Sequence, residues 1–273
     1  MVFENYNMDR PLPSIFPKSW TSEMVEKFDL MEFRNLSHFK STVSQLKQIE
    51  DDKCGLSYKS ALDKLVRGVT DFPESEQASI RNLVRSNLHK RGLITQEVYE
   101  EFKYATDGVV VGIDVGKFTS GEPDCAIVPT QQYVDFFYEL YISISYPWDI
   151  PNDRVRDNTA KLLATIEELE RQHIFIKITL VLPIRGCSMG TPSNFFSTIP
   201  LFSHKEQKSV STMSSVINER LLRKFYFAIL ETHYGGMLTG GYGHPVTLST
   251  AMNIGNQFDE IAFFESITKA VGA

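Results

Sequence analysis

Polar side chains follow a long apolar stretch in YELYISISYPWDIP, residues 138–151, which ends at a proline. Ser143 and Ser145 alternate there, and Asp149 and Asp153 follow shortly afterwards. Hydroxyls and carboxylates together are oxygen ligands of the kind that Mg²⁺ takes in proteins. Open α/β sheets bind their ligands at the carboxyl ends of the strands, so the position suits such a site.

The spacing of the two serines is similar to the metal site of von Willebrand factor A-type domains. That site is built on Asp-x-Ser-x-Ser at the end of a first parallel strand. In this chain the position of the aspartate is taken by Tyr141, which carries no charge at neutral pH. We therefore expect no metal here, and a von Willebrand A-like interaction module with a degenerate metal site is kept as an alternative function.

Three further segments carry residue types found in catalytic or phosphate-binding sites. Residues 235–245 are rich in glycine but lack the lysine of a phosphate-binding loop. Asp114, Glu122 and Asp124 could form a carboxylate cluster, although a turn capped by Asp and Gly also accounts for them. Cys187 has no histidine paired with it in the sequence. We therefore expect no catalytic residue, no cofactor and no enzymatic activity.

Basic side chains gather in two stretches. Residues 77–96 contain no acidic residue, and Arg81, Arg85 and His89 are spaced four apart, so they share one helix face. The second stretch is RLLRKFYF, residues 220–227. Lysine and arginine beside aromatic rings suit single-stranded nucleic acid, because both phosphates and bases are then held. The candidate nucleic-acid contacts are Arg81, Arg85, Lys90, Arg91, Arg223, Lys224 and Tyr226. A solvated face over a hydrophobic core is the alternative for both stretches.

The elements that would position these residues fall into two regions. Residues 1–106 predict a helical N-terminal region, since apolar side chains recur at helical spacing. Its predicted helices cover residues 35–50, 57–68, 73–92 and 95–105. Residues 107–273 predict an α/β domain in which strands and helices alternate. Its predicted strands cover residues 109–115, 133–146, 174–183, 195–202 and 259–264, and its predicted helices cover residues 151–172 and 209–234.

The firmest part of this pattern is the strand–helix–strand unit at 133–183. Such a unit favours a right-handed crossover and a parallel pair of strands. The near-continuous apolar run of 174–183 is typical of a parallel strand covered on both faces. The predicted fold class is α/β: a Rossmann-like (von Willebrand A-like), partly parallel sheet with flanking helices, preceded by the helical region.

Composition limits the partners. The chain has 273 residues, 42% hydrophobic and 23% charged, as expected of a soluble globular protein. No apolar run approaches the ~20 residues of a membrane span, the N-terminus lacks the pattern of a secretory signal, and the three cysteines lack disulfide or zinc spacing. We therefore expect a cytoplasmic protein without a membrane partner. Its net charge of −6 means that nucleic acid would need a local basic patch and that binding would weaken with salt.

Several segments occur in a familiar order: RSNLHKRGLITQEVYE, DVGKFTSGEPDCAI, VRDNTAKLLATIEELERQHIFIKITLVLP and AMNIGNQFDEIAFF. The chain thereby resembles a family of uncharacterised phage and plasmid proteins with a D-V-G-x-(Y/F)-x-x-G-x-P-(E/D)-C segment. We link that family to Drc, the single-stranded-DNA-binding RNA polymerase cofactors of short-tailed lytic phages. The resemblance implies a non-enzymatic transcription cofactor in the host cytoplasm, with single-stranded DNA and a phage RNA polymerase as partners. It assigns no role to any single residue, and the oligomeric state stays open.

Overall fold

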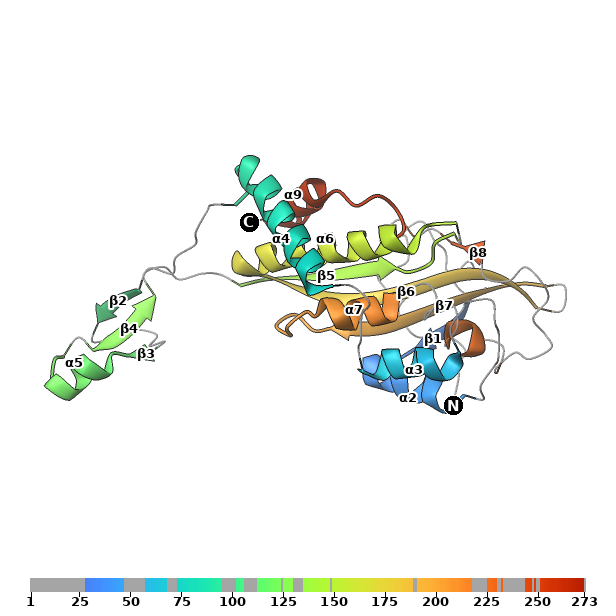
Figure 1. The fold of residues 1–273 in the computed structure, drawn as a ribbon, viewed down its shortest axis with the longest axis horizontal. Helices are drawn as coiled ribbons and strands as arrows, with labels where there is room; N and C mark the ends of the chain where they lie inside the picture. The colour runs from blue at the N-terminus through green and yellow to red at the C-terminus, as the bar shows by residue number, and fades with distance from the viewer. Residues whose placement is uncertain are drawn as a thin grey trace.

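The computed structural model shows a mixed α/β fold in which a partly parallel sheet is flanked by helices, as the sequence predicts (Figure 1). This Rossmann-like arrangement is preceded by helices from the N-terminal part of the chain. The structure describes residues 28–46, 57–67, 73–94, 102–105, 112–123, 125–129, 135–147, 149–188, 191–217, 225–229, 232, 244–246, 248 and 251–272.

The main sheet has the strand order β1-β7-β6-β5-β9, with β8 also paired to β6. Its strands are β1 (Phe28–Glu32), β5 (Phe136–Ser143), β6 (Ile174–Ser188), β7 (Thr191–Phe202), β8 (His244–Pro245) and β9 (Met252–Asn253). β5 runs parallel to β6 and to β9, and β1 runs parallel to β7. β6 and β7 form a long antiparallel pair, so the predicted strand 195–202 is confirmed and extends further back.

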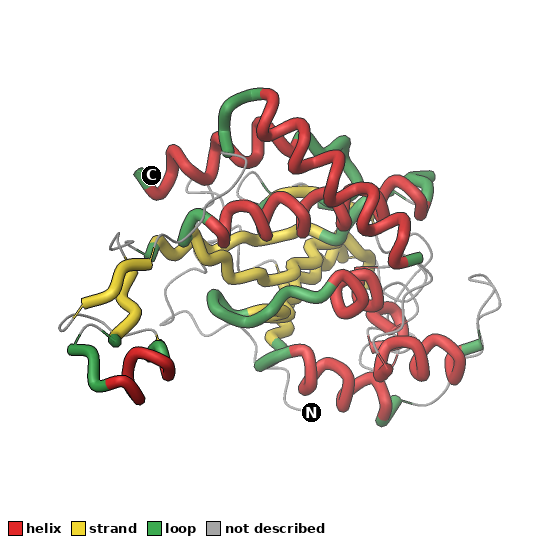
Figure 2. Tube along the Cα trace, turned by 60° about the vertical axis from the view of Figure 1, so that its left-hand side comes forward, coloured by secondary structure: helices red, strands yellow, loops and turns green. Residues whose placement is uncertain are grey.

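Helix α6 (Asn152–Arg171) is the crossover between the parallel strands β5 and β6. It covers one face of the sheet, where it packs on β6 (Figure 2). Two of its threonines are buried. Their hydroxyls are satisfied within the helix, since Thr159 donates to the carbonyl of Val155 and Thr165 donates to that of Lys161. Helices α4 (Glu74–Lys90) and α9 (Glu260–Val271) pack on α6 and form an outer layer.

Three further helices lie close to β7 and α6: α2 (Leu36–Ser44), α3 (Tyr58–Arg67) and α7 (Val210–Ile217). α2 contacts β7 and α3, while α7 contacts both α3 and α6. The buried Tyr58 hydroxyl donates to the carbonyl of Val43 at 2.6 Å, and its ring meets Phe225 edge-on at a centroid distance of 5.3 Å. These contacts join the N-terminal helices to the core of the α/β part.

A small antiparallel sheet stands to one side of the main sheet (Figure 1). It has the order β2-β4-β3, formed by β2 (Phe102–Ala105), β3 (Gly112–Ile113) and β4 (Ala126–Pro129), with helix α5 (Val115–Ser120) beside it. The Asp114 carboxylate caps α5 by accepting from the backbone N–H of Lys117 at 3.1 Å. Gly121 ends the helix with a φ of 77°, the left-handed conformation that glycine adopts without strain.

The structure corrects three predicted elements. The segment 259–264 is the start of helix α9 and not a strand, since the Asp259 carboxylate accepts from the N–H groups of Ile261 and Ala262 as an N-cap. A short apolar run does not distinguish strand from helix, so the pattern was ambiguous. Residues 102–105, expected at the end of a helix, form strand β2. Within the predicted strand 109–115, only 112–113 are described as a strand, and Val115 already begins α5.

The packing also crosses the predicted division at residue 106. β1, from the N-terminal region, is part of the main sheet beside β7. α4 packs on α6, and β2 pairs with β4. Elements from both sides of residue 106 therefore share one main sheet and one hydrophobic core.

Candidate nucleic-acid interface

The serine-rich end of β5 is buried beside β9. Ser143 and Ser145 are both buried. The strand β9 covers them: Ile254 donates its N–H to the carbonyl of Ser143, and the Asn253 side chain donates to the carbonyl of Ser145 at 2.9 Å. The Asn158 amide of α6 holds this segment by donating to the carbonyl of Ile254 at 2.8 Å. The backbone of both serines is therefore part of a strand junction, and their hydroxyls are buried: that of Ser143 accepts from the Ser145 N–H at 3.4 Å, while that of Ser145 has no hydrogen-bond partner among the described residues.

The other candidate chemistry does not assemble where the chain is described. Asp114 is occupied as the cap of α5, while Asp124 and most of the glycine-rich segment 235–245 lie outside the described residues. Cys187 pairs through its backbone with Pro192 at the far end of the β6–β7 hairpin. Across the described parts of the chain, no three His, Cys, Asp or Glu side chains gather into a potential metal site.

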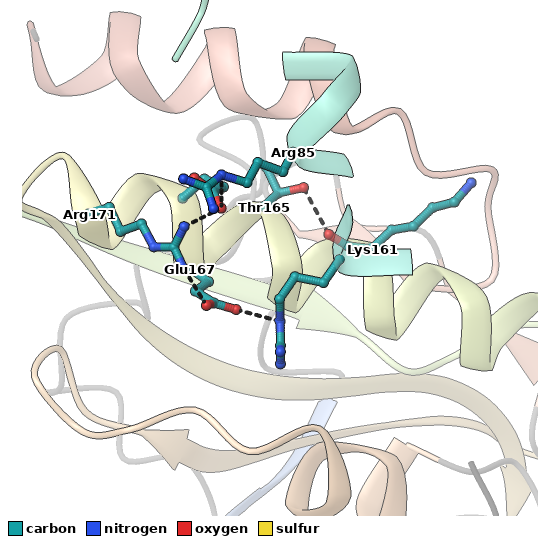
Figure 3. A network of polar contacts seen from close by, with 7 residues as sticks. Arg85, Lys161, Thr165, Glu167 and Arg171 are labelled. Atoms are coloured by element: carbon teal, nitrogen blue, oxygen red, sulfur yellow. Dashed lines mark hydrogen bonds and ion pairs between the residues drawn. The ribbon is translucent and has the colours of Figure 1, made fainter. Parts of the chain in front are cut away.

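The basic face of α4 is turned in part toward α6. There, Arg81 and Arg171 bind the Glu167 carboxylate at 2.9 Å each (Figure 3). Arg171 also binds Glu168 at 2.9 Å, and Arg85 approaches the same carboxylate at 3.9 Å. Burial raises the pKa of the Glu168 carboxyl, while Arg171 and Arg85 act in the opposite direction. Arg81 and Arg85 therefore help to hold the two helices together.

Of the remaining sequence-predicted contacts, those that the structure describes differ in exposure. Lys90 and Arg91 are exposed at the C-terminal end of α4. Arg223 and Lys224 lie outside the described residues. Tyr226 is buried in the hydrophobic core with only 1% of its surface exposed, so it cannot stack on a base in this arrangement. Among the predicted residues that the structure describes, Lys90 and Arg91 alone are exposed and form no ion pair with a described carboxylate.

An aromatic surface lies elsewhere, on the sheet face opposite α6. Side chains alternate along a strand, so the residues of β5 and β6 that do not pack under α6 share the other face. Cross-strand pairs arrange them in rows, with Phe137 beside Phe175 and then Glu139 beside Lys177. We call this surface the aromatic face and define it as Phe137, Glu139, Tyr141, Phe175, Lys177, His204 and Lys205.

The two phenylalanines form the centre of the aromatic face. Their rings are stacked at 29° with centroids 6.0 Å apart, and Phe137 is 53% exposed. His204 meets the Phe137 ring edge-on at 5.2 Å. The Lys205 ammonium lies 5.7 Å from the Phe137 centroid and 5.0 Å from that of Phe175, within the range of a cation–π contact.

Charged groups line the rest of the aromatic face. Lys177 donates to the Glu139 carboxylate at 2.9 Å, and the Tyr141 hydroxyl donates to the same carboxylate at 2.9 Å. The Lys177 ammonium is the main cause that lowers the pKa of Glu139, so this carboxylate is ionised at neutral pH. At the start of β5, Asp135 binds Lys205 at 2.6 Å.

The loop that carries His204 and Lys205 is fixed from inside by a buried lysine. Lys208 has only 4% of its side chain exposed and binds the Glu170 carboxylate of α6 at 2.5 Å. Its ammonium also donates to the carbonyls of His204 at 2.8 Å and Glu206 at 3.0 Å. The loop after β7 is thereby anchored to α6, and this anchor positions Lys205 over the phenylalanine rings.

Sequence reasoning missed the aromatic face, although its signal is present. Phe137, Glu139 and Tyr141 repeat with a period of two, as do Phe175 and Lys177. The apolar run of β6 was expected to be covered on both faces, but this holds only for its later part, since Phe175 and Lys177 are partly exposed. The Lys205 ammonium comes from the loop after β7. The residue pattern of β5 or β6 alone does not reveal that this loop lies beside them.

Comparison with known proteins gives a family but no function. A family model described as a domain of unknown function, DUF7192, matches residues 20–270. No curated protein and no solved structure matches the chain. Among the helices that the structure describes, none has the length and apolar character to span a lipid bilayer. The match runs over almost the whole sequence, and the chain belongs to the DUF7192 family.

Proposed function

We propose that this protein binds single-stranded DNA on the aromatic face and acts without catalysis. The observation that carries the proposal is the exposed Phe137 ring, stacked with the partly exposed Phe175 ring, with the Lys205 ammonium above both rings. Unpaired bases stack on such rings, and lysines beside them hold the backbone phosphates. A sheet surface with aromatic side chains is a common platform for single-stranded nucleic acid.

The charge of the aromatic face determines the character of the binding. Lys177 and Lys205 each have an acidic neighbour, Glu139 and Asp135, and the whole chain carries a net charge of −6. Long-range attraction to DNA is therefore weak, and stacking contributes a large share of the affinity. Base–aromatic stacking contributes about 1–3 kcal/mol per base and tolerates any sequence, so we expect binding with little sequence preference.

A role in transcription is the further part of this proposal. The resemblance to Drc supports a cofactor that holds single-stranded DNA for a phage RNA polymerase in the host cytoplasm. A protein that binds a displaced strand needs no active site of its own. The alternative of a von Willebrand A-like interaction module has no specific observation in its favour, because the strand end on which it depends is covered by β9.

Fluorescence anisotropy with a labelled oligothymidylate tests the binding. At about 50 mM salt, where electrostatic contacts are strongest, we expect the full chain to bind and Phe137→Ala to weaken binding about 5- to 100-fold. Leu83→Ala is the matched control, since Leu83 is an apolar residue on α4 with similar exposure. No binding by the wild-type chain, or equal affinity of the Phe137 and Leu83 variants, would refute the proposal.

A further inference from the structure

One carboxylate lies at the edge of the aromatic face and holds its most exposed cation. Asp135, just before β5, binds the Lys205 ammonium at 2.6 Å through one oxygen and the His173 ring at 3.2 Å through the other. These two partners, Lys205 first, lower the pKa of Asp135. The carboxylate is therefore ionised at neutral pH and occupies the position at which a DNA phosphate would meet the same ammonium.

The ion pair between Asp135 and Lys205 also keeps the Lys205 ammonium over the two phenylalanine rings. Lys205 is 61% exposed and could extend into solvent, yet in this arrangement its ammonium stands over both Phe137 and Phe175. A base can stack on these rings only after the ammonium has moved aside. The ion pair and the stacked base therefore exclude one another.

We propose that Asp135 is an intramolecular competitor that holds Lys205 over the phenylalanine rings in the free protein, which we call the closed state. A phosphate of the incoming strand displaces the carboxylate, Lys205 turns to the DNA backbone, and a base takes its place on the rings. This inference rests on the proposed function, whose binding site it describes in more detail. The closed state lowers the apparent affinity by the fraction of molecules that are open.

The experiment compares Asp135→Asn with the wild-type chain by oligothymidylate anisotropy at about 50 mM salt. Asp135→Asn removes an exposed ion pair, and this should raise the affinity for the oligonucleotide about two- to fivefold. Glu265→Gln is the control for net charge, because Glu265 is an exposed acid on α9. Its affinity should stay within experimental error of the wild type.

Asp135→Asn would also raise the affinity if the carboxylate merely repelled the DNA phosphates. The same substitution in a Lys205→Met chain separates repulsion from competition for Lys205. In the Lys205→Met chain the competitor has no cation to hold, so Asp135→Asn should add nothing there. A gain of equal size in both backgrounds would overturn the inference, as would a wild-type chain that binds as tightly as Asp135→Asn. If neither the wild type nor Asp135→Asn binds, the proposed function itself fails together with the inference.

Discussion

Replacing the buried Lys208 by methionine should destabilise the fold and disturb the aromatic face together. Methionine fills the space of the side-chain stem but removes the ion pair with Glu170 and the hydrogen bonds to the carbonyls of Ser203, His204 and Glu206. Removing one partner of a buried ion pair costs about 3–5 kcal/mol. The Glu170 Oε1 that faces Lys208 is itself buried, but the side chain as a whole is 24% exposed, so we expect the lower end, about 3 kcal/mol in the free energy of unfolding.

Urea denaturation followed by circular dichroism measures this loss, and thermal melting should show a decrease of roughly 6–10 °C for a chain of this size. Lys205→Met is the matched control, since it also loses an ion pair, but an exposed one. If the two variants lose the same stability, Lys208 does not anchor the loop. The double variant Lys208→Met with Glu170→Gln should lose less than the sum of the single changes, because the two groups are coupled.

The stability of the Lys208 variant should also depend on pH. Burial raises the pKa of Glu170 above its ordinary value of 4.5, against the opposing effect of Lys208. A carboxyl with a raised pKa stabilises the folded state below its unfolded pKa, and this contribution is lost as the pH rises through the folded pKa. Without the ammonium, only the hydrogen bond with the Ile176 backbone still opposes burial, so the pKa of Glu170 rises further. The deficit of Lys208→Met should therefore be largest at neutral pH and shrink toward a pH of about 4.5.

Three further changes test separate parts of the structure. Arg81→Gln should cost no more than about 1 kcal/mol of stability, since its ion pair is exposed, and should leave oligonucleotide affinity unchanged in the anisotropy assay. Burial raises the pKa of Tyr58 to about 12, so Tyr58→Phe should leave the ultraviolet titration of the phenols unchanged below a pH of about 11. The phenol's contribution to stability is present below its unfolded pKa and lost as the pH rises through 12. Gly255→Ala places a Cβ 2.6 Å from that of Tyr146 and should cost about 1–3 kcal/mol in a urea titration, whereas the exposed Gln257→Ala should cost little.

The sequence allowed the crossover unit to be predicted because its signals are local. The apolar spacing of α6 and the strands on either side of it need no distant information, and the pairing of β5 with β6 follows from the right-handed crossover rule. β1 could not be placed in the main sheet in this way, since its partner β7 is far away along the chain. Its pairing depends on long-range contacts that no periodicity encodes.

The proposed binding surface is harder to predict for the same reason. Arg81 and Arg85 share a helix face, as expected, but their partners Glu167 and Glu168 come from another helix. A count of charges along one segment does not show that distant carboxylates neutralise them. Phe137 and Phe175 become neighbours only through strand pairing, and Lys205 joins them from a third part of the chain.

Photochemical cross-linking tests the central claim most directly. The full chain is irradiated with an oligonucleotide that carries 4-thiothymine, and mass spectrometry identifies the linked peptides. We expect cross-links at Phe137, Phe175 or His204, and their loss when excess unlabelled single-stranded DNA competes. Cross-links concentrated at Lys90 and Arg91 of α4, with none on β5, β6 or the loop after β7, would contradict it.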